Sequence, residues 1–439
     1  MRKLLLATAA TMGALLVTVG GAQAQPVKPV APGTIAVHLN GYLQFGIGYF
    51  GSSANNFGGS KLNPYNTIGD ARLYSGFDAQ TLNGIDYGAQ IEVRTTASDA
   101  GTRAGLNTGT SGTAGTTSLY VKRAYGYIGT PEAGFVRLGQ TDSAFTLLQT
   151  GVIEGYGDGA QFNSDGGIFN AIPSNAEPGT FVYADSSHLY STNKVVYLSP
   201  TVAGFSMGVG FEPNSDGLKE GTAACSTAAS LSGANSACGS IASSPNTNAN
   251  FRRNTIDAAL LYAGTFGDFA TKANLGILNA APIANTAAPA PTGANRFKGM
   301  TVYQAGAQTS FGGLTLGANV KWGSVTNGYG FKIAGARNAI DYIVGGTYTV
   351  GPWVAGVSFI DGQSSGNWNM TNHVGRTLDE YGVAAGGNYV VGKDLSLYLQ
   401  YEYGHRHQAD WNFNANSASA AASGNAQFQT IATGATYKW

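Results

Sequence analysis

The sequence predicts an all-β protein, a transmembrane antiparallel β-barrel, from three observations. After residue 24 no run of about 18 apolar residues occurs, so no membrane-spanning helix is available. The composition is unusual for a soluble enzyme, with 64 glycines, 23 tyrosines, 20 phenylalanines and only 11% charged residues. Apolar and polar residues alternate over many stretches. A barrel accounts for all three, because its strands turn apolar side chains to lipid and polar ones to a wet lumen.

The first residues predict export. Arg2 and Lys3 are basic, residues 4–19 are mostly apolar and uncharged, and Ala22-Gln23-Ala24 supplies the small residues that a signal peptidase requires. We therefore expect a signal peptide over 1–24, a proline-rich periplasmic lead-in over 25–33 and a single barrel over 34–439.

The first clear hairpin lies at residues 70–94. Leu73 and Phe77 alternate with Arg72 and Asp78, which predicts a strand with one apolar and one polar face. An Asn-Gly turn follows and leads into a second alternating stretch, which is typical of a β-hairpin.

This pattern recurs along the chain and gives the strand count. Short turns are predicted at 82–84, 131–134, 200–204, 266–268, 312–313, 350–352 and 392–393. Longer polar stretches are predicted near 51–67, 98–116, 142–180, 214–251, 280–298, 325–337, 362–376 and 407–426. Seven turns and eight loops connect sixteen strands of roughly 9–11 residues, and an even count with short periplasmic turns and long extracellular loops is typical of outer-membrane barrels. Eighteen strands would result if a loop hid a hairpin, most easily at 181–198.

A soluble sandwich or propeller is the alternative all-β fold. Aromatic residues gather near turns and loop mouths here, for example Tyr49, Phe269, Trp322 and Trp353. Membrane-interface girdles require this placement and a soluble sandwich does not.

Three stretches resemble the general porins of Gram-negative proteobacteria. The opening strand 35–45 is similar to their first strand, and the block 123–140 resembles the hairpin that leads to their constriction loop. The chain ends in Tyr437-Lys438-Trp439, similar to the terminal signal that the barrel-assembly machinery reads. Two positions depart from the family pattern. Trp439 replaces the usual Phe, and Gln140 stands where many members carry Arg.

The resemblance implies an outer-membrane, water-filled channel for passive diffusion of small hydrophilic solutes and ions. It implies a homotrimer in contact with outer-membrane lipid and lipopolysaccharide, with neither a catalytic site nor a cofactor. It also implies that the third long loop, 142–180, folds into the lumen. The acidic residues of that loop, expected at the constriction, are Asp142, Glu154, Asp158 and Asp165.

A basic wall is expected opposite these acids, as in the family. Arg72, Arg94 and Arg137 fall on the polar phase of their strands, that is, on the alternate positions that carry polar residues and are expected to face the lumen. Lys122 and Arg123 are adjacent, so by alternation only one can point inward, and the phase of Tyr120 favours Lys122. Such charges facing each other would set a field across the pore. The alternative is that Arg72 and Arg94 pair with their neighbours Asp70 and Glu92 and stiffen the wall.

Other motifs predict no chemistry. Cys225 and Cys238 lie in one loop, and an oxidising periplasm favours a disulfide between them. His405 and His407 lack defined partner acids, so no metal site is predicted. The 24 basic and 24 acidic residues give no positive excess, which argues against nucleic acid.

Two further function classes remain open. A substrate-specific porin for a sugar or an anion would need an aromatic track or a dense basic funnel, and Tyr74, Tyr120 and Tyr398 leave the sugar case open. A barrel-scaffold adhesin or outer-membrane enzyme would need richer loops or a nucleophile–base pair, and neither is evident in the sequence.

Overall fold

The computed structural model describes residues 30–53, 56–57, 60–61, 63–95, 119–163, 167–173, 175–178, 183, 192–215, 217, 252–282, 297–368, 375–415, 417–419 and 424–439. The predicted signal peptide, residues 25–29 of the predicted lead-in, Asp165, Cys225 and Cys238 lie outside the described residues.

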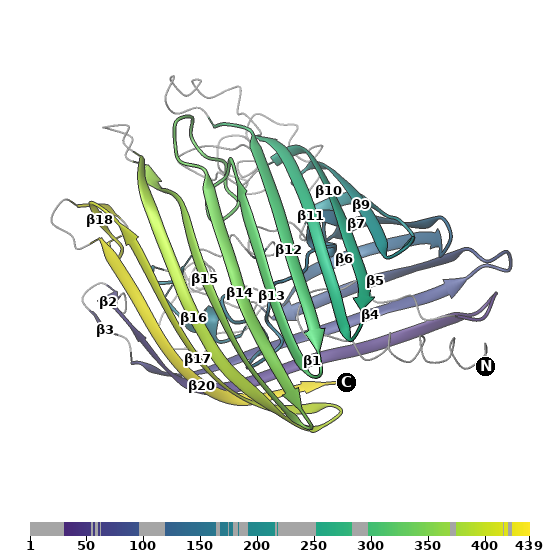
Figure 1. Ribbon diagram of the computed structural model, residues 1–439, viewed down its shortest axis with the longest axis horizontal. Helices are drawn as coiled ribbons and strands as arrows, with labels where there is room; N and C mark the ends of the chain where they lie inside the picture. The colour runs from purple at the N-terminus through teal and green to yellow at the C-terminus, as the bar shows by residue number, and fades with distance from the viewer. Residues whose placement is uncertain are drawn as a thin grey trace, which may run out of the picture.

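Sixteen antiparallel strands form one closed barrel (Figure 1). The first eight are β1 (Ile35–Ser52), β4 (Tyr65–Gln80), β5 (Asp86–Thr95), β6 (Leu119–Thr130), β7 (Gly134–Thr141), β8 (Thr192–Leu198), β9 (Phe205–Asn214) and β10 (Arg252–Phe266). The others are β11 (Phe269–Pro282), β12 (Met300–Phe311), β13 (Leu314–Gly323), β14 (Ala339–Val350), β15 (Trp353–Trp368), β16 (Gly375–Gly392), β17 (Leu395–Gln408) and β20 (Asn425–Lys438). Strand β1 pairs with both β4 and β20, which closes the sheet and removes its edges.

Four short strands and two short helices complete the described structure. The two-stranded sheets are β2 (Asn56–Phe57) with β3 (Ser60–Lys61), and β18 (Trp411–Asn412) with β19 (Ser417–Ala418). The helices are α3 (Ala144–Leu147) and the 3-10 turn η1 (Phe169–Ala171). Within the described residues, no helix is long and apolar enough to cross a membrane.

The predicted count of sixteen strands is confirmed, and the structure places a strand pair around each of the seven predicted turns. The predicted strand length is wrong for several strands: β1 and β16 have 18 residues each. Strand β15 runs on to Trp368, into a stretch predicted as loop, because residues 361–365 pair with 377–381 of β16. Backbone hydrogen bonds between strands form whatever the side chains are. These polar strand ends lack the apolar alternation from which the strands were predicted, so the sequence did not indicate them.

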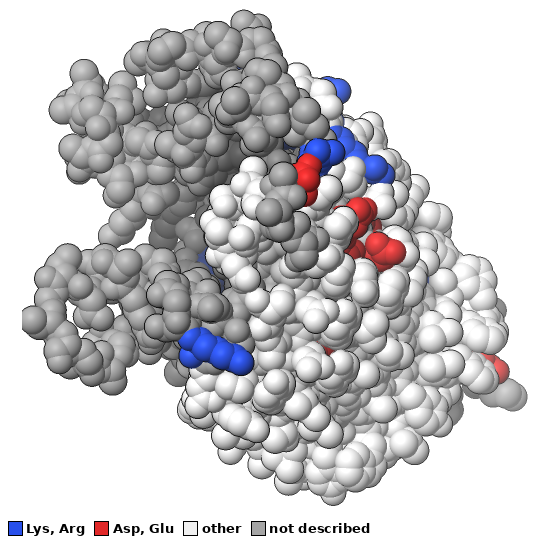
Figure 2. All heavy atoms as spheres, turned by 90° about the vertical axis from the view of Figure 1, so that its left-hand side faces the viewer, with Lys and Arg blue, Asp and Glu red and all other residues white. Residues whose placement is uncertain are grey.

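The barrel is apolar outside and polar inside. Outward positions are exposed and apolar, such as Leu275 (61% exposed), while their neighbours on the other face, such as Asn274, are buried. Figure 2 shows one face, on which charged side chains gather mainly in the upper part above a broad area almost without charge. This arrangement is the reverse of a soluble protein and suits strands that contact lipid.

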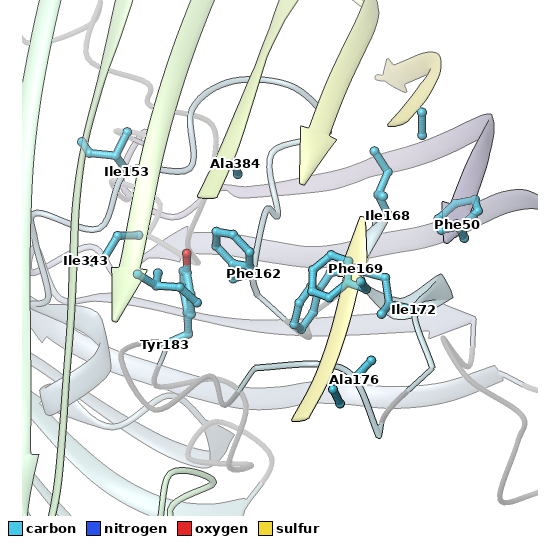
Figure 3. Packing of buried hydrophobic residues seen from close by; sticks show 14 of the residues in the cluster. Phe50, Ile153, Phe162, Ile168, Phe169, Ile172, Ala176, Tyr183, Ile343 and Ala384 are labelled. Atoms are coloured by element: carbon cyan, nitrogen blue, oxygen red, sulfur yellow. The ribbon is translucent and has the colours of Figure 1, made fainter. Parts of the chain in front are cut away.

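Apolar side chains of the long β7–β8 connection pack against the wall. Phe145 joins a cluster with Leu278 and Val302. A second cluster surrounds Phe162 and Phe169, whose rings lie 6.0 Å apart (Figure 3). These clusters hold the described residues of 145–176 against strands that are mostly far later in the chain.

Candidate functional site

The β7–β8 connection first runs along β10 to β13. Ser143 caps α3 by accepting a hydrogen bond from the backbone N–H of Thr146, which starts a short helix directly after β7. The backbone N–H of Phe145 then donates to Asp257 Oδ1 on β10 at 2.8 Å, and Asn319 Nδ2 on β13 donates to the carbonyl of Thr150 at 2.8 Å. Wall side chains of the polar phase therefore hold the backbone of this segment.

The next part of the connection lies against β15 to β17. The hydroxyls of Tyr156 and Ser358 on β15 are 2.7 Å apart, and Tyr156 also donates to the carbonyl of Ala384 on β16 at 3.0 Å. The backbone N–H of Asp158 donates to Gln400 Oε1 on β17 at 2.8 Å.

The described part of the connection then reaches β20. The ring of Phe169 lies 6.1 Å from that of Phe428 on β20. Arg406 on β17 donates to the carbonyl of Asn175 at 3.2 Å. We call the described residues of 142–178 the wall segment, because their contacts follow the polar-phase side of the strands from β10 to β20.

Two glycines permit the closest approach of this segment to the wall. A Cβ on Gly306 of β12 would lie 2.1 Å from the carbonyl oxygen of Thr150. A Cβ on Gly151, whose φ is +85°, would lie 2.0 Å from the carbonyl oxygen of Ala318. Only glycine allows backbone to meet backbone here, and only it adopts such a φ without strain.

The three predicted acidic residues that the structure describes lie in the wall segment, but their carboxylates have different partners. Asp142 is buried and forms an ion pair with Arg123, with 3.0 Å between Oδ2 and Nε. Glu154 accepts a hydrogen bond from Asn163 Nδ2 at 2.8 Å. Glu154 thus has a partner inside its own segment.

Asp158 turns its carboxylate toward the backbone of its own segment. It accepts hydrogen bonds from the N–H groups of Ala160 at 2.9 Å and Ile168 at 2.6 Å. Burial raises the pKa of Asp158, and these two donors partly oppose that rise. The carboxylate therefore organises the tip of the wall segment.

Two of the predicted basic residues lie side by side on β4 and β5, whereas Arg137 lies on β7 opposite Tyr127. Arg72 and Arg94 are directly paired across β4 and β5. Arg72 also bonds to Asp70 at 2.7 Å between Nη2 and Oδ2, and Arg94 forms an ion pair with Glu92. The neighbour pairing that the sequence left open is thus present in the structure.

Aromatic rings support two of these arginines. The guanidinium of Arg137 lies 5.0 Å from the ring centroid of Tyr125, and that of Arg72 lies 4.9 Å from the ring centroid of Tyr42. Such contacts hold a guanidinium flat against the wall.

The expectation that only one of Lys122 and Arg123 can point inward is wrong. The pairing of β5 with β6 shifts between Glu92 and Val93, so that Glu92 opposes Arg123 while Val93 opposes Val121. This β-bulge adds one residue and breaks the alternation, and both Lys122 and Arg123 are buried. Arg123 bonds to Glu92 and Asp142 and is a site residue that the sequence reasoning missed.

Gln140 completes the bulge. Its side-chain amide donates to the carbonyls of Val121 at 3.0 Å and Lys122 at 2.9 Å. The amide donates to both carbonyls, so this position stabilises the backbone that presents Arg123.

A second buried charge cluster was also missed. Glu212 on β9 bonds to Arg252 on β10 at 3.2 Å and lies 3.6 Å from Lys194 on β8. Beside it Asp257 accepts the hydrogen bond from Phe145 described above. The sequence alone shows an acidic residue at a polar position of each of β9 and β10. It does not show which basic residues these acids face, because that depends on the register of the strands.

No metal centre is formed by the described residues, in which no group of three His, Cys, Asp or Glu side chains could hold an ion. His405 stacks on Tyr381 with 5.0 Å between the ring centroids. His407 Nδ1 lies 2.8 Å from Asn425 Oδ1.

The comparisons with known proteins agree with this barrel. The family profile described as "Gram-negative porin" matches residues 7–439. No curated protein matches the chain significantly. Two similar solved structures are a loop-L8 deletion mutant of OmpT from Vibrio cholerae (14% identity, 92% of this chain and 99% of that one, TM-score 0.52) and an anion-selective porin from Comamonas acidovorans (14% identity, 92% and 100%, TM-score 0.51). A porin refined at 1.8 Å resolution is equally similar (14% identity, 92% and 100%, TM-score 0.51).

These structures share the fold of this chain, and the profile covers nearly its whole length. The chain therefore belongs to the Gram-negative porins, outer-membrane β-barrel channels for passive diffusion that carry out no catalysis.

Proposed function

We propose that the wall segment is folded into the lumen and narrows the channel, with the solute path between it and the wall built by β1 and β4 to β7. One observation carries the proposal: the segment is hydrogen-bonded to polar-phase side chains of successive strands, from Asp257 on β10 to Gln400 on β17. Polar-phase side chains of a lipid-facing barrel point away from lipid. We also propose that the seven short turns are periplasmic and that the long connections are extracellular.

The proposed path is bordered by a wall that carries both charges. Arg72, Arg94, Lys122, Arg123 and Arg137 are accompanied there by Asp70, Asp78, Asp86, Glu92 and Asp142. The donors to Glu154 and Asp158 are neutral and leave the carboxylate charge in place, but they turn both carboxylates toward the segment, so we expect them to act on the path more weakly than the wall arginines. The proposed function is therefore a diffusion porin for small polar solutes with weak ion selectivity.

Reversal potential in planar bilayers tests this function. Refolded wild type is compared with R72Q/R94Q, which removes two wall cations, and with E154Q/D158N, which removes two segment acids. We expect R72Q/R94Q to shift the selectivity toward cations and E154Q/D158N to change it less. R253Q is the matched control, because Arg253 is exposed at the end of β10.

The absence of ohmic channel steps, or a larger shift in E154Q/D158N than in R72Q/R94Q, would contradict the proposal. Block by one sugar or by phosphate would favour the substrate-specific alternative. The structure offers that alternative little support, because Tyr398 is buried and bonded to Gln44 and so cannot complete an exposed aromatic track.

Four assignments from the sequence stay proposals: cleavage of the signal peptide after Ala24, the Cys225–Cys238 disulfide, recognition of Tyr437 and Trp439 by the assembly machinery, and a homotrimer in contact with outer-membrane lipid. Membership of the porin family supports them. Chemical cross-linking of the purified protein, read against its mass in detergent, tests the trimer.

A further inference from the structure

The connection between β13 and β14, residues 324–338, packs against the polar-phase side of the barrel. Three of its side chains, Val325, Tyr329 and Phe331, are at most 1% exposed. They belong to one apolar cluster with Phe145 of the wall segment. The connection therefore lies beside the first part of the wall segment, on the same side of the strands.

The strand ends under this connection are apolar at positions of the polar phase. Leu278 on β11 and Met300 and Val302 on β12 are fully buried in the cluster. On the same face of these strands, Asn274 and Gln304 lie nearer the short turns and are polar. Apolar side chains that face water cost free energy, so these strand ends require a cover, and the connection provides it.

The connection is held by contacts of its own as well. The backbone N–H of Lys298, just before β12, donates to the carbonyl of Lys332 at 2.9 Å. The rings of Phe297 and Phe331 lie 6.2 Å apart. The ammonium of Lys332 donates to the carbonyl of Ala336 within the connection. The connection is thus a structured element that can hold other groups in place.

Lys321 on β13 joins this connection to the first part of the wall segment. Its side chain is 0% exposed, and its ammonium donates to Gln149 Oε1 of the wall segment at 2.7 Å. The ammonium also lies 5.4 Å from the ring centroid of Phe145 and 5.8 Å from that of Tyr329. A buried charge costs free energy unless its partners surround it. The ammonium therefore favours the arrangement in which segment and connection are both in place.

A second chain of contacts leads to the far end of the wall segment. Asn327 of the connection donates its side-chain amide to Glu380 Oε2 on β16. The other oxygen of Glu380 accepts a hydrogen bond from Arg406 Nε on β17 at 2.6 Å. Arg406 Nη1 in turn donates to the carbonyl of Asn175 at 3.2 Å. The connection thus reaches the wall segment at two places that are far apart along it.

We propose that the β13–β14 connection is a brace that fixes the position of the wall segment, with Lys321 and Asn327 as its positioning residues. The brace acts near both ends of the segment, at Gln149 and at Asn175. Its effect on the current rests on the placement of the segment in the solute path proposed above. The other explanation is that the connection only covers the apolar ends of β11 and β12. In that case the ammonium of Lys321 and the amide of Asn327 would not matter for the segment.

Limited proteolysis of refolded protein in detergent tests the brace. Chymotrypsin cleaves after aromatic residues, and mass spectrometry locates each cut within 142–178. K321M keeps the length of the side chain but removes the ammonium, and N327A removes the amide at the other contact. We expect each variant to raise the rate of cleavage within 142–178 by at least roughly tenfold, because loss of a hydrogen bond to a charged group favours the open form of the segment. The open-channel current should be noisier in both variants.

The matched controls are K393M, in the exposed turn between β16 and β17, and N338A, at an exposed position of the same connection. Both should be cleaved as wild type. Heat-modifiable gel mobility shows whether each variant is folded. If K321M does not fold, N327A decides alone, because Asn327 is only partly buried.

Wild-type cleavage of 142–178 in both variants would overturn the proposal, and so would an increase that is limited to 324–338. A changed conductance without increased cleavage would overturn it as well, because the two side chains would then act on the path directly. Increased cleavage of 142–178 with unchanged current would support the brace and contradict only the placement of the wall segment in the solute path.

Discussion

At the scale of single residues, the charges of the candidate site have partners of different kinds: backbone N–H groups, neighbours on the same strand, and residues of another strand. Asp158 was predicted from an acidic, glycine-rich stretch, and the structure places its carboxylate on two backbone N–H groups of its own segment. Arg72 and Asp70 are two residues apart, so the sequence could offer their pairing as an alternative. The contact of Arg123 with Asp142 joins two strands whose register the sequence does not contain.

Replacing Asp158 by Ala should loosen the wall segment. The N–H groups of Ala160 and Ile168 would lose their acceptor, and each unsatisfied buried group costs about 1–3 kcal/mol. We expect noisier open-channel current and little change in the unfolding temperature of the barrel, which its strand pairing maintains. E132A, in the exposed turn after β6, is the control. Quiet current in D158A would show that the other contacts suffice.

Glu177 should make the wall segment sensitive to pH. Burial raises its pKa to about 7, which Arg406 partly opposes, whereas the unfolded value is 4.5. The folded state therefore keeps a proton that the unfolded state has lost between these values, and the attachment should weaken as the pH rises through about 7. Arg406 is itself paired with Glu380. The buried Glu402 lies four residues before Arg406 on the same face of β17, so several acidic groups surround Glu177.

Limited proteolysis of the reconstituted protein between pH 5 and pH 8 measures this effect. Cleavage within 142–178 should increase with pH in wild type and stay constant in E177Q. The same pH dependence in E177Q would assign it to another group.

At the scale of elements, period-two alternation and turn residues predicted the hairpins, because both are local properties of the chain. The β6 bulge was missed because an inserted residue changes no composition and only shifts a register. Strand ends were misplaced for a related reason: polar residues such as Gln363 pair across strands without an apolar face. Local patterns thus predict elements, and irregular pairing decides which side chains face the channel.

The contact between β12 and the wall segment gives a prediction at this scale. A methyl group on Gly306 would overlap the carbonyl of Thr150, so G306A should push the segment away from its wall. We expect lower single-channel conductance and a loss of about 1–3 kcal/mol in stability, as overpacking generally causes. G69A on β4 is the matched control, because there the nearest atom is at 3.6 Å. Unchanged conductance in G306A would place the segment outside the solute path.

At the scale of the whole molecule, the fold was predictable because a membrane strand must show lipid one face and water the other. This constraint acts on every strand, so the alternation of apolar and polar residues recurs along the sequence and indicates a barrel. The wall segment has no such repetition. Its contacts join residues as distant as Asp158 and Gln400, and they are fixed only when the barrel closes.

Trp439 adds a contact at the seam where β1 and β20 close the barrel. Gly41 on β1 exchanges backbone hydrogen bonds with Trp439 at 3.1 Å and 3.3 Å, and a Cβ on Gly41 would lie 2.0 Å from the indole ring. The ring therefore covers the backbone of β1 at the seam between β1 and β20. An aromatic side chain of smaller size still fits this place, whereas a branched side chain at Gly41 displaces it.

We therefore expect W439F to assemble as wild type, and both G41V and deletion of Trp439 to reduce the folded barrel in the outer membrane. Heat-modifiable gel mobility of membrane fractions measures the folded fraction. G392A is the control, because a Cβ there has no atom within 4 Å. If deletion of Trp439 lowers assembly while G41V does not, the terminal aromatic acts as a recognition signal alone. If both lower it, the contact across the seam is itself required, because G41V leaves the terminal signal intact.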